Sequence, residues 1–202
     1  LSKLYKYSYL QTSYGVNNIA LVNGRPQQLN VKQMLTEFIK FRLEVIVRRT
    51  KYDLKKAEER AHILEGLLIA LANIDQVIAI IRASKTVEAA KEGLIAAFEL
   101  SEIQAKAILE MRLQKLVSLE VDKIKKEHEE LMVKIAHYKE IIASEELQRG
   151  IIKDEMAELK EKYGDERRTD VVYAEGDISI EDIIEQEQMV VTISHLGYIS
   201  GN

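Results

Sequence analysis

Residues 54–71 read LKKAEERAHILEGLLIAL, and their spacing predicts a long helix that needs a partner. Apolar residues recur at alternating intervals of three and four, at Leu54, Ala57, Ala61, Leu64, Leu68 and Leu71. Side chains at these intervals share one side of an α-helix and form the seam of a coiled coil. Around this stretch, residues 30–74 contain no proline and only Gly66, and Asn30 suits an N-cap. About forty residues at about 1.5 Å each make a rod of roughly 60 Å, too long for a compact domain of this size.

A second seam supplies the partner. It consists of Val121, Ile124, His128, Leu131, Ile135, Tyr138 and Ile142, extended by Leu147, Ile152, Met156, Leu159 and Tyr163. Gly164 is placed to end the helix, as glycine commonly does. We therefore expect residues 120–164 to form one helix that runs antiparallel to residues 30–74. Residues 75–119 would then be a tip of three short helices, with Ser84 or Thr86 and Ser101 as candidate caps.

The last helix of this tip is apolar on more than one face, and a domain this small cannot cover all of that surface by itself. We infer that the tip dimerises, with the contact formed by Ile108, Leu109, Arg112, Leu113 and Leu116. The alternative is that the same side chains pack against the ends of the rod.

The two ends of the chain have β character. Asn23-Gly24 supplies the positive φ angles of a tight turn and predicts a β-hairpin within residues 1–29, after a short helix. After Gly164, residues 165–188 read as a β-prone run and an acidic linker, and residues 189–202 as a strand without a visible partner. Because the chain begins on Leu1 and ends after this strand, we expect it to be part of a larger protein.

The predicted fold class is thus mainly α: a long antiparallel coiled coil with a small helical tip, a short N-terminal β-hairpin and short C-terminal strands. Nine glycines and one proline disfavour an all-β fold, and the absence of cysteine removes disulfides and thiolate metal sites. No apolar run reaches the roughly 18 residues of a membrane span, so a cytoplasmic protein is expected. Neither a phosphate loop nor paired histidines are present, and we expect no metal site and no cofactor in this chain.

Basic residues gather between Lys40 and Arg60, and the net charge of the chain is only -4. Arg48, Arg49, Lys55 and Lys56 are the candidates for weak contact with DNA phosphates. The alternative is that these side chains cover the outer face of a helix and pair with nearby glutamates.

Five segments carry a resemblance to a known family. They are YLQTSYGVNNIALVNGRPQQLNVKQML (9–35), AEERAHILEGLLIALANIDQVIAIIR (57–82), QAKAILEMRLQKLVSLE (104–120), DERRTDVVY (165–173) and MVVTISHLGYIS (189–200). In this order they resemble the A subunit of bacterial DNA gyrase, a type IIA DNA topoisomerase, over essentially the whole chain.

The resemblance implies a role for each segment. Residues 1–29 would end the tower region beside the DNA gate, and residues 30–74 and 120–164 would form a descending and an ascending arm helix. Residues 75–119 would be the exit gate, where two copies of the chain meet. Residues 165–188 would return toward the tower, and residues 189–202 would begin the DNA-wrapping domain.

The activity implied is the ATP-dependent passage of one DNA duplex through a transient double-strand break, with introduction of negative supercoils. The implied partners are a second copy of the chain at the exit gate, the gyrase B subunit in an A2B2 holoenzyme, and double-stranded DNA. Through the B subunit the holoenzyme would use ATP and Mg²⁺. The family's nucleophilic tyrosine lies in an Ala-Ala-(Met/Arg)-Arg-Tyr-Thr context that none of the nine tyrosines has, so no catalytic residue is predicted. The A subunit of topoisomerase IV and a non-enzymatic coiled-coil scaffold are the alternatives.

Overall fold

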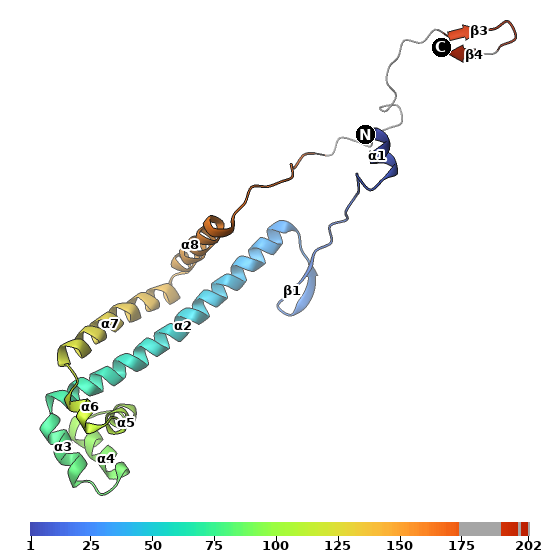
Figure 1. Cartoon of the computed structure of the whole chain (residues 1–202). Coiled ribbons are helices and arrows are strands. Elements are labelled where there is room, and N and C mark those ends of the chain that lie inside the picture. Colours follow the sequence, from blue (N-terminus) through green and yellow to red (C-terminus); the bar gives the residue numbers. More distant parts are fainter. Residues whose placement is uncertain (174–190, 198, 202) are drawn as a thin grey trace. The chain divides into compact units, whose positions relative to one another are not determined.

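The computed structural model describes residues 1–173, 191–197 and 199–201 (Figure 1). The chain divides into two compact units, one of Ile19–Gly164 and one of Leu1–Asn18 with Asp165–Asn202. The larger unit contains all the residues predicted to act at a site. Its elements are β1 (Ile19–Val22), β2 (Arg25–Gln28), α2 (Val31–Ala72), α3 (Ile74–Ala83), α4 (Val87–Phe98), α5 (Glu102–Glu110), α6 (Leu113–Val117), α7 (Val121–Ala143) and α8 (Glu145–Tyr163).

Helix α2 is one uninterrupted helix of 42 residues. It begins at a capping box, in which Asn30 Oδ1 accepts the backbone N–H of Gln33 over 2.8 Å and Gln33 Oε1 accepts that of Asn30 over 2.9 Å. The predicted N-cap is therefore confirmed. At Asn73 the chain turns by 91° into α3. Within the described residues, no single helix has the length and apolar content to cross a membrane, and only the bent pair α2–α3 passes that test jointly.

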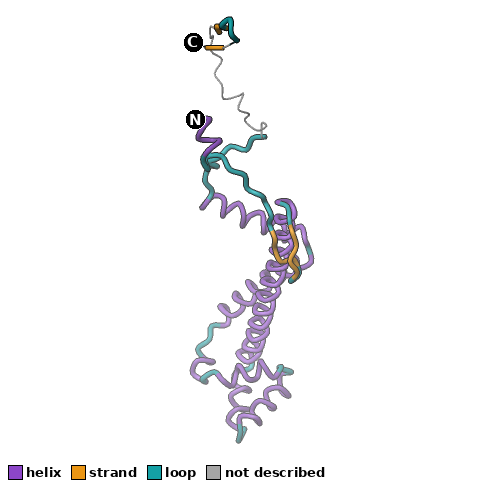
Figure 2. The backbone as a smooth tube through the Cα atoms, turned by 90° about the vertical axis from the view of Figure 1, so that its right-hand side faces the viewer, coloured by secondary structure: helices purple, strands orange, loops and turns teal. Residues whose placement is uncertain are grey.

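Helices α2 and α7 lie side by side along the arm (Figures 1 and 2). Ala57 and Ala61 of the predicted seam are buried against Ile135 of the second seam, with Leu54, Leu131 and Tyr138 packed around them. Nearer the start of α2, Ile46 packs against Ile141 and Ile152, which lie further along the return arm. The pairing is therefore antiparallel, as expected. The alanines let the two backbones approach closely at this level.

The return arm differs from the prediction, because it is two helices and not one. Helix α7 ends and α8 begins at Ser144, whose φ of -124° and ψ of 109° are extended. The Ser144 hydroxyl accepts the N–H of Leu147, and the Gln148 amide donates to the carbonyl of Ile141 over 2.9 Å. Both free helix ends therefore gain polar partners, which offsets the cost of the break.

An isoleucine cluster fills the inside of this break. Ile46 of α2 is completely buried between Ile141 at the end of α7 and Ile152 of α8. The continuous helix thus packs against both halves of the interrupted one. We refer to Ser144 and this cluster as the elbow.

The tip consists of α3, α4, α5 and α6, with a core that continues into the arm. Thr86 and Ser101 cap α4 and α5, as predicted, through hydrogen bonds from the N–H groups of Ala89 and Gln104. The expected third helix of the tip is divided into α5 and α6, because Met111 and Arg112 adopt extended backbone angles. The buried core comprises Leu64, Leu67, Ala70, Val77, Leu94, Leu100, Ala105, Ile108, Leu116 and Ile124.

The predicted hairpin is confirmed. Strands β1 and β2 pair antiparallel from Ile19↔Gln28 to Val22↔Arg25. Asn23 and Gly24 connect them with φ angles of 51° and 76°, the left-handed region that this turn requires.

In the smaller unit, α1 (Ser2–Tyr7) confirms the short N-terminal helix. The strand predicted over residues 189–202 is instead a hairpin, in which β3 (Val191–Ile193) pairs antiparallel with β4 (Ile199–Gly201) around Gly197. Residues 165–173 contain no strand, contrary to the β-prone character predicted for them. The acidic linker at residues 174–188 lies outside the described residues.

Candidate functional site

Two of the five residues predicted to form a dimer contact lie inside the tip. Ile108 and Leu116 are each 1% exposed and belong to its core. Because both side chains are covered by their own chain, they are placed as core residues here, and the predicted dimer contact itself stays a prediction. Ile108 of α5 and Leu116 of α6 belong to the core that these helices share with the end of the arm.

The remaining three residues lie at the surface or next to it. Leu109 is half-buried against the core, Arg112 is exposed, and Leu113 is 41% exposed. Val117, which was not in the predicted set, is 56% exposed and lies one helical turn after Leu113. We call Leu113 and Val117 the α6 stripe. The spacing of four between Leu113 and Val117 could have indicated that both lie on one face of a helix. The sequence did not show that α6 is a separate short helix, and so the exposure of this face was missed.

A partly buried lysine fixes the neighbouring helices of the tip. The ammonium group of Lys91 on α4 lies 3.0 Å from Glu88 of the same helix and 3.0 Å from Glu102 at the start of α5. The hydrogen bond with Glu102, then that with Glu88, raises the pKa of Lys91, and the same bond lowers the pKa of Glu102. The charged pair thus holds α4 against α5 near neutral pH.

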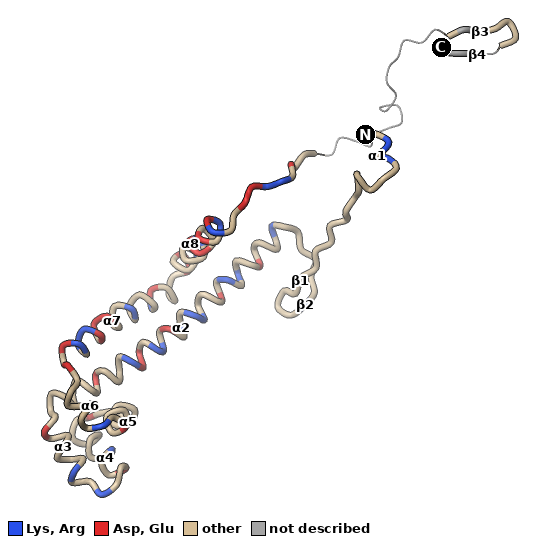
Figure 3. Tube along the Cα trace, viewed as in Figure 1, with Lys and Arg blue, Asp and Glu red and all other residues tan. Residues whose placement is uncertain are grey.

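Basic and acidic residues are interspersed along the helices of the arm (Figure 3). The basic ones divide into those that form ion pairs and those that do not. Arg49 donates to Glu155 of α8 over 2.7 Å, and Lys55 and Lys56 each lie 4.0 Å from Glu59. Three of the four residues predicted to contact phosphates are thus engaged with carboxylates of this chain, as the alternative interpretation expected. In the part of the chain that the structure describes, Arg48 has no ion pair.

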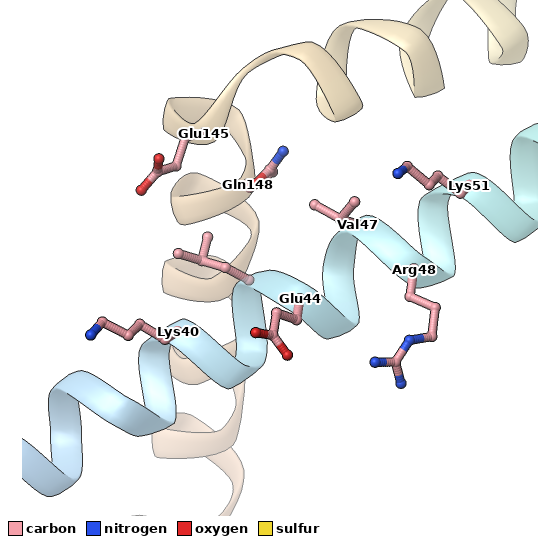
Figure 4. A pocket seen from close by; sticks show the side chains of 8 residues that line it. Lys40, Glu44, Val47, Arg48, Lys51, Glu145 and Gln148 are labelled. Carbon is pink, nitrogen blue, oxygen red and sulfur yellow. The ribbon is translucent and has the colours of Figure 1, made fainter. Parts of the chain in front are cut away.

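Arg48 lines a groove at the elbow (Figure 4). The groove is lined by Lys40, Leu43, Glu44, Val47, Arg48, Lys51, Glu145 and Gln148. Lys51, like Arg48, makes no ion pair within the described residues, whereas Lys40 lies 3.4 Å from Glu37. Because Glu44 and Glu145 share the groove, its charge is mixed and not strongly basic. Contact with DNA at this position stays a prediction and rests on Arg48, with Lys51 as a further candidate.

Among the described residues, two ion pairs and one histidine–glutamate contact join α2 to α7. Arg60 donates to Glu127 over 2.9 Å, His128 lies 2.9 Å from Glu65, and Lys139 lies 3.7 Å from Glu58. The hydrogen bond from Arg60 lowers the pKa of the Glu127 carboxyl. These contacts at the surface of the arm favour one alignment of α2 with α7.

Across residues 1–173, 191–197 and 199–201, no three His, Cys, Asp or Glu side chains lie close enough to hold a metal ion. His128 contacts a glutamate of the facing arm helix, which is a structural arrangement. The α6 stripe and the arm surfaces suit association and mechanical support.

Comparison with known proteins gives a consistent result. The family model for the A subunit of DNA gyrase/topoisomerase IV matches residues 1–157. The DNA gyrase A subunit of Clostridium acetobutylicum is 54% identical over 199 residues, which are 98% of this chain and 24% of that protein. The same subunit of Streptomyces coelicolor is 53% identical, and that of Mycobacterium tuberculosis 48%, each over 98% of this chain and 23% or 24% of the relative. The chain thus spans about a quarter of the length of these relatives.

Proposed function

Because the chain belongs to the family of DNA gyrase and topoisomerase IV A subunits, we propose that it is the coiled-coil arm and exit gate of a DNA gyrase. The observation that carries this proposal is the α6 stripe, an exposed apolar surface on a small helical tip at the end of the arm that α2 forms with α7 and α8. Apolar side chains in such a place favour self-association. In this proposal two tips meet through α6 and part again when a duplex leaves.

The arm has the structure that a mechanical role requires. The 42 residues of α2 make a helix about 63 Å long, and no break interrupts it. Cross-arm ion pairs and the buried seam join α2 to α7 and α8, so that a force at one end displaces the tip at the other. The arm transmits motion, and the chemistry of DNA cleavage belongs to another part of the holoenzyme.

We infer that the complete enzyme is an ATP-hydrolysing type II topoisomerase that introduces negative supercoils. Its partners are a second copy of this chain, the gyrase B subunit in an A2B2 assembly, and double-stranded DNA. The B subunit holds ATP and Mg²⁺ in this proposal. The chain by itself is expected to be inactive, because none of its nine tyrosines has the sequence context of the family's nucleophile. Because the proposed substrate is the bacterial chromosome, which lies in the cytoplasm, we infer a cytoplasmic location.

The A subunit of topoisomerase IV is the alternative within the same family model. The relatives from Clostridium, Streptomyces and Mycobacterium are all gyrase A subunits, at 48–54% identity, and this favours gyrase. A scaffold without a role in strand passage explains the arm and the tip equally well from geometry. It gives no reason for the similarity to gyrase over 98% of the chain.

The test is the solution mass of the 202-residue chain, measured by light scattering over a concentration series. We expect a reversible dimer for the wild type, and a folded monomer for the double variant Leu113→Glu, Val117→Glu, because two carboxylates would enter each side of an apolar contact. Val133→Glu is the matched control, since Val133 is also apolar and 71% exposed but lies on α7 in the arm. This control should remain dimeric.

Two results contradict the proposal. One is a wild-type chain that stays monomeric at the highest concentration, and the other is a double variant that dimerises as strongly as the wild type. Far-ultraviolet circular dichroism of each protein shows whether the helices are intact. If only the helical signal of the double variant is lost, the single variant Val117→Glu, at the more exposed position of the two, replaces it.

A further inference from the structure

The described residues form capping boxes of the same design at the starts of α2 and α5, and of these two boxes the one at α5 contacts another helix. In the Asn30–Gln33 box at the start of α2, the Gln33 side chain is exposed, and its amide NH₂ has no partner within the described residues. In the Ser101–Gln104 box at the start of α5, the Gln104 side chain is buried. A second contact therefore distinguishes Gln104 from Gln33.

The second contact joins the tip to the arm. The amide NH₂ of Gln104 donates to the backbone carbonyl of His62, in the last third of α2, over 2.7 Å. The oxygen of the same amide accepts the backbone N–H of Ser101 over 3.0 Å. One side chain thus caps α5 with its oxygen and holds α2 with its nitrogen.

The imidazole of His62 completes the contact. Its Nε2 lies 2.6 Å from Ser101 Oγ, and its Nδ1 lies 3.4 Å from the Gln104 amide nitrogen. Because the amide oxygen faces a backbone N–H, the group facing Nδ1 is an NH₂ donor. Nδ1 must then accept, so the proton is on Nε2 and is donated to the serine hydroxyl. The neighbours of the two imidazole nitrogens thus determine which nitrogen donates and which accepts.

Close packing leaves this contact little freedom. Gly66 lies directly against the Gln104 side chain, and a Cβ at residue 66 would stand 2.8 Å from Gln104 Cβ and 2.9 Å from its Cγ. Helices α2 and α5 therefore approach more closely here than side chains at both positions would ordinarily allow. A buried polar contact with close packing specifies one geometry, because any displacement leaves a buried amide unsatisfied.

We propose that Gln104 is a positioning residue that sets the angle of the tip on the arm, and through that angle the strength of the contact between two tips. The inference rests on the proposed function of the tip as a dimerising gate. Residues of the α6 stripe make that contact, whereas Gln104 acts only by holding α5, and with it the helices packed on α5, in one orientation. Without the hydrogen bond from Gln104 to the His62 carbonyl, the tip still folds, but its orientation on the arm varies from one molecule to the next.

The variant Gln104→Glu separates the two roles. A glutamate preserves the reciprocal cap, since Ser/Thr-x-x-Glu is the commonest form of the box, but it cannot donate to the His62 carbonyl. Gln33→Glu is the matched control, because it makes the same change in a box that touches no other helix within the described residues. The variant Gln104→Met removes both the capping bond and the bond to the His62 carbonyl, without placing a charge in a buried position.

The orientation of the tip is measured by the distance between two spin labels on one chain. The native chain has no cysteine, so Glu92→Cys on α4 and Val133→Cys on α7, both exposed, are labelled specifically. Labelled chains are diluted with an excess of unlabelled chains of the same genotype. Light scattering or sedimentation of the unlabelled proteins gives the dimer dissociation constant in parallel.

We expect a narrow distance distribution in the wild type and in Gln33→Glu, and a broader one in Gln104→Glu and Gln104→Met. The dissociation constant should rise about tenfold in both Gln104 variants, the equivalent of one lost buried hydrogen bond, with the helical signal retained. Wild-type distributions and affinity in Gln104→Glu would mean that Gln104 is only a cap, and would overturn the proposal. A wild type that does not dimerise contradicts the gate itself, and the distance distributions then decide on the positioning role alone.

Discussion

Arg42 on α2 and Glu155 on α8 lie 2.7 Å apart, although 113 positions separate them in the chain. Arg49 donates to the other oxygen of the same carboxylate, also over 2.7 Å, so that Glu155 binds α2 at two points about two helical turns apart. The Arg42 Nε is buried without a hydrogen-bond partner among the described residues. This carboxylate is therefore the main polar link between the continuous helix and the half of the return arm beyond the elbow.

Replacement of Glu155 by glutamine should destabilise the unit. Two charge-assisted hydrogen bonds weaken and two arginines lose their counter-charge, so we expect a loss of about 1–3 kcal/mol in the free energy of unfolding. Urea denaturation measures the change. Glu158→Gln is the control, since its partner Lys162 lies on the same helix and both side chains are exposed, and it should cost less than about 0.5 kcal/mol. Equal effects of the two variants would refute the special role of Glu155.

Stability should fall in acid. Hydrogen bonds from Arg49 and then Arg42 lower the pKa of the Glu155 carboxyl, and the bond from Arg60 lowers that of Glu127, both from an ordinary value of 4.5. A carboxyl whose pKa is lower in the folded state stabilises that state above its ordinary pKa, and loses this contribution as the pH falls further. Urea midpoints measured from neutral pH down into acid should drop below pH 4.5. The drop should be smaller in the double variant Glu127→Gln, Glu155→Gln, and an equal drop in both proteins would contradict this account.

Truncation of Ile46 should open a cavity at the elbow. Ile46 is 0% exposed and packs with isoleucines of both return helices, so Ile46→Ala is expected to cost about 2–5 kcal/mol. Thermal or chemical unfolding tests this. Val133→Ala removes a similar group from an exposed position and should change the stability by less than about 0.5 kcal/mol. If Ile46→Ala is as mild as the control, the elbow is not a packed joint.

Binding of the chain to DNA should depend on unpaired cations and not on paired ones. We expect weak binding of a labelled duplex by fluorescence anisotropy, and Arg48→Ala should lower the magnitude of the salt slope of log K by about 0.9, as the loss of one phosphate contact does. Arg49→Ala should leave the slope unchanged, because Glu155 already holds that guanidinium. A larger effect of Arg49→Ala, or no binding at low salt, would show that the groove does not face DNA.

Local pattern predicted much of this molecule. The seam through Ala57 and Ala61 and the capping box at Asn30 follow from spacings of a few residues. The turn at Asn23-Gly24 follows from the φ angles that these two residues tolerate. Such features depend on neighbours in the chain, which the sequence displays directly. The resemblance to the gyrase family likewise rests on local motifs, and comparison with known proteins confirms it.

Other features depend on residues that only folding brings together. The alternation of three and four stops at Ile142, and the next apolar steps, to Leu147 and then to Ile152, are five residues each. The helix breaks at Ser144, where Gln148 satisfies a carbonyl at the end of α7 and Ile46 packs across the break. The changed spacing was a signal of this break that the prediction of one helix overlooked, but the spacing alone does not show that the two halves pack on the same helix. The sequence also could not divide α5 from α6.

The sequence by itself determined a long α-helix, an antiparallel return, a helical tip and the family, because apolar periodicity and local motifs are written along the chain. The tertiary structure decided which apolar residues of the tip are covered, placing Ile108 and Leu116 in the core and Leu113 at the surface. It also decided that Glu155 holds Arg49, while Arg48 forms no ion pair with any described residue. Burial and pairing are properties of contacts between distant segments, and no spacing within one segment specifies them.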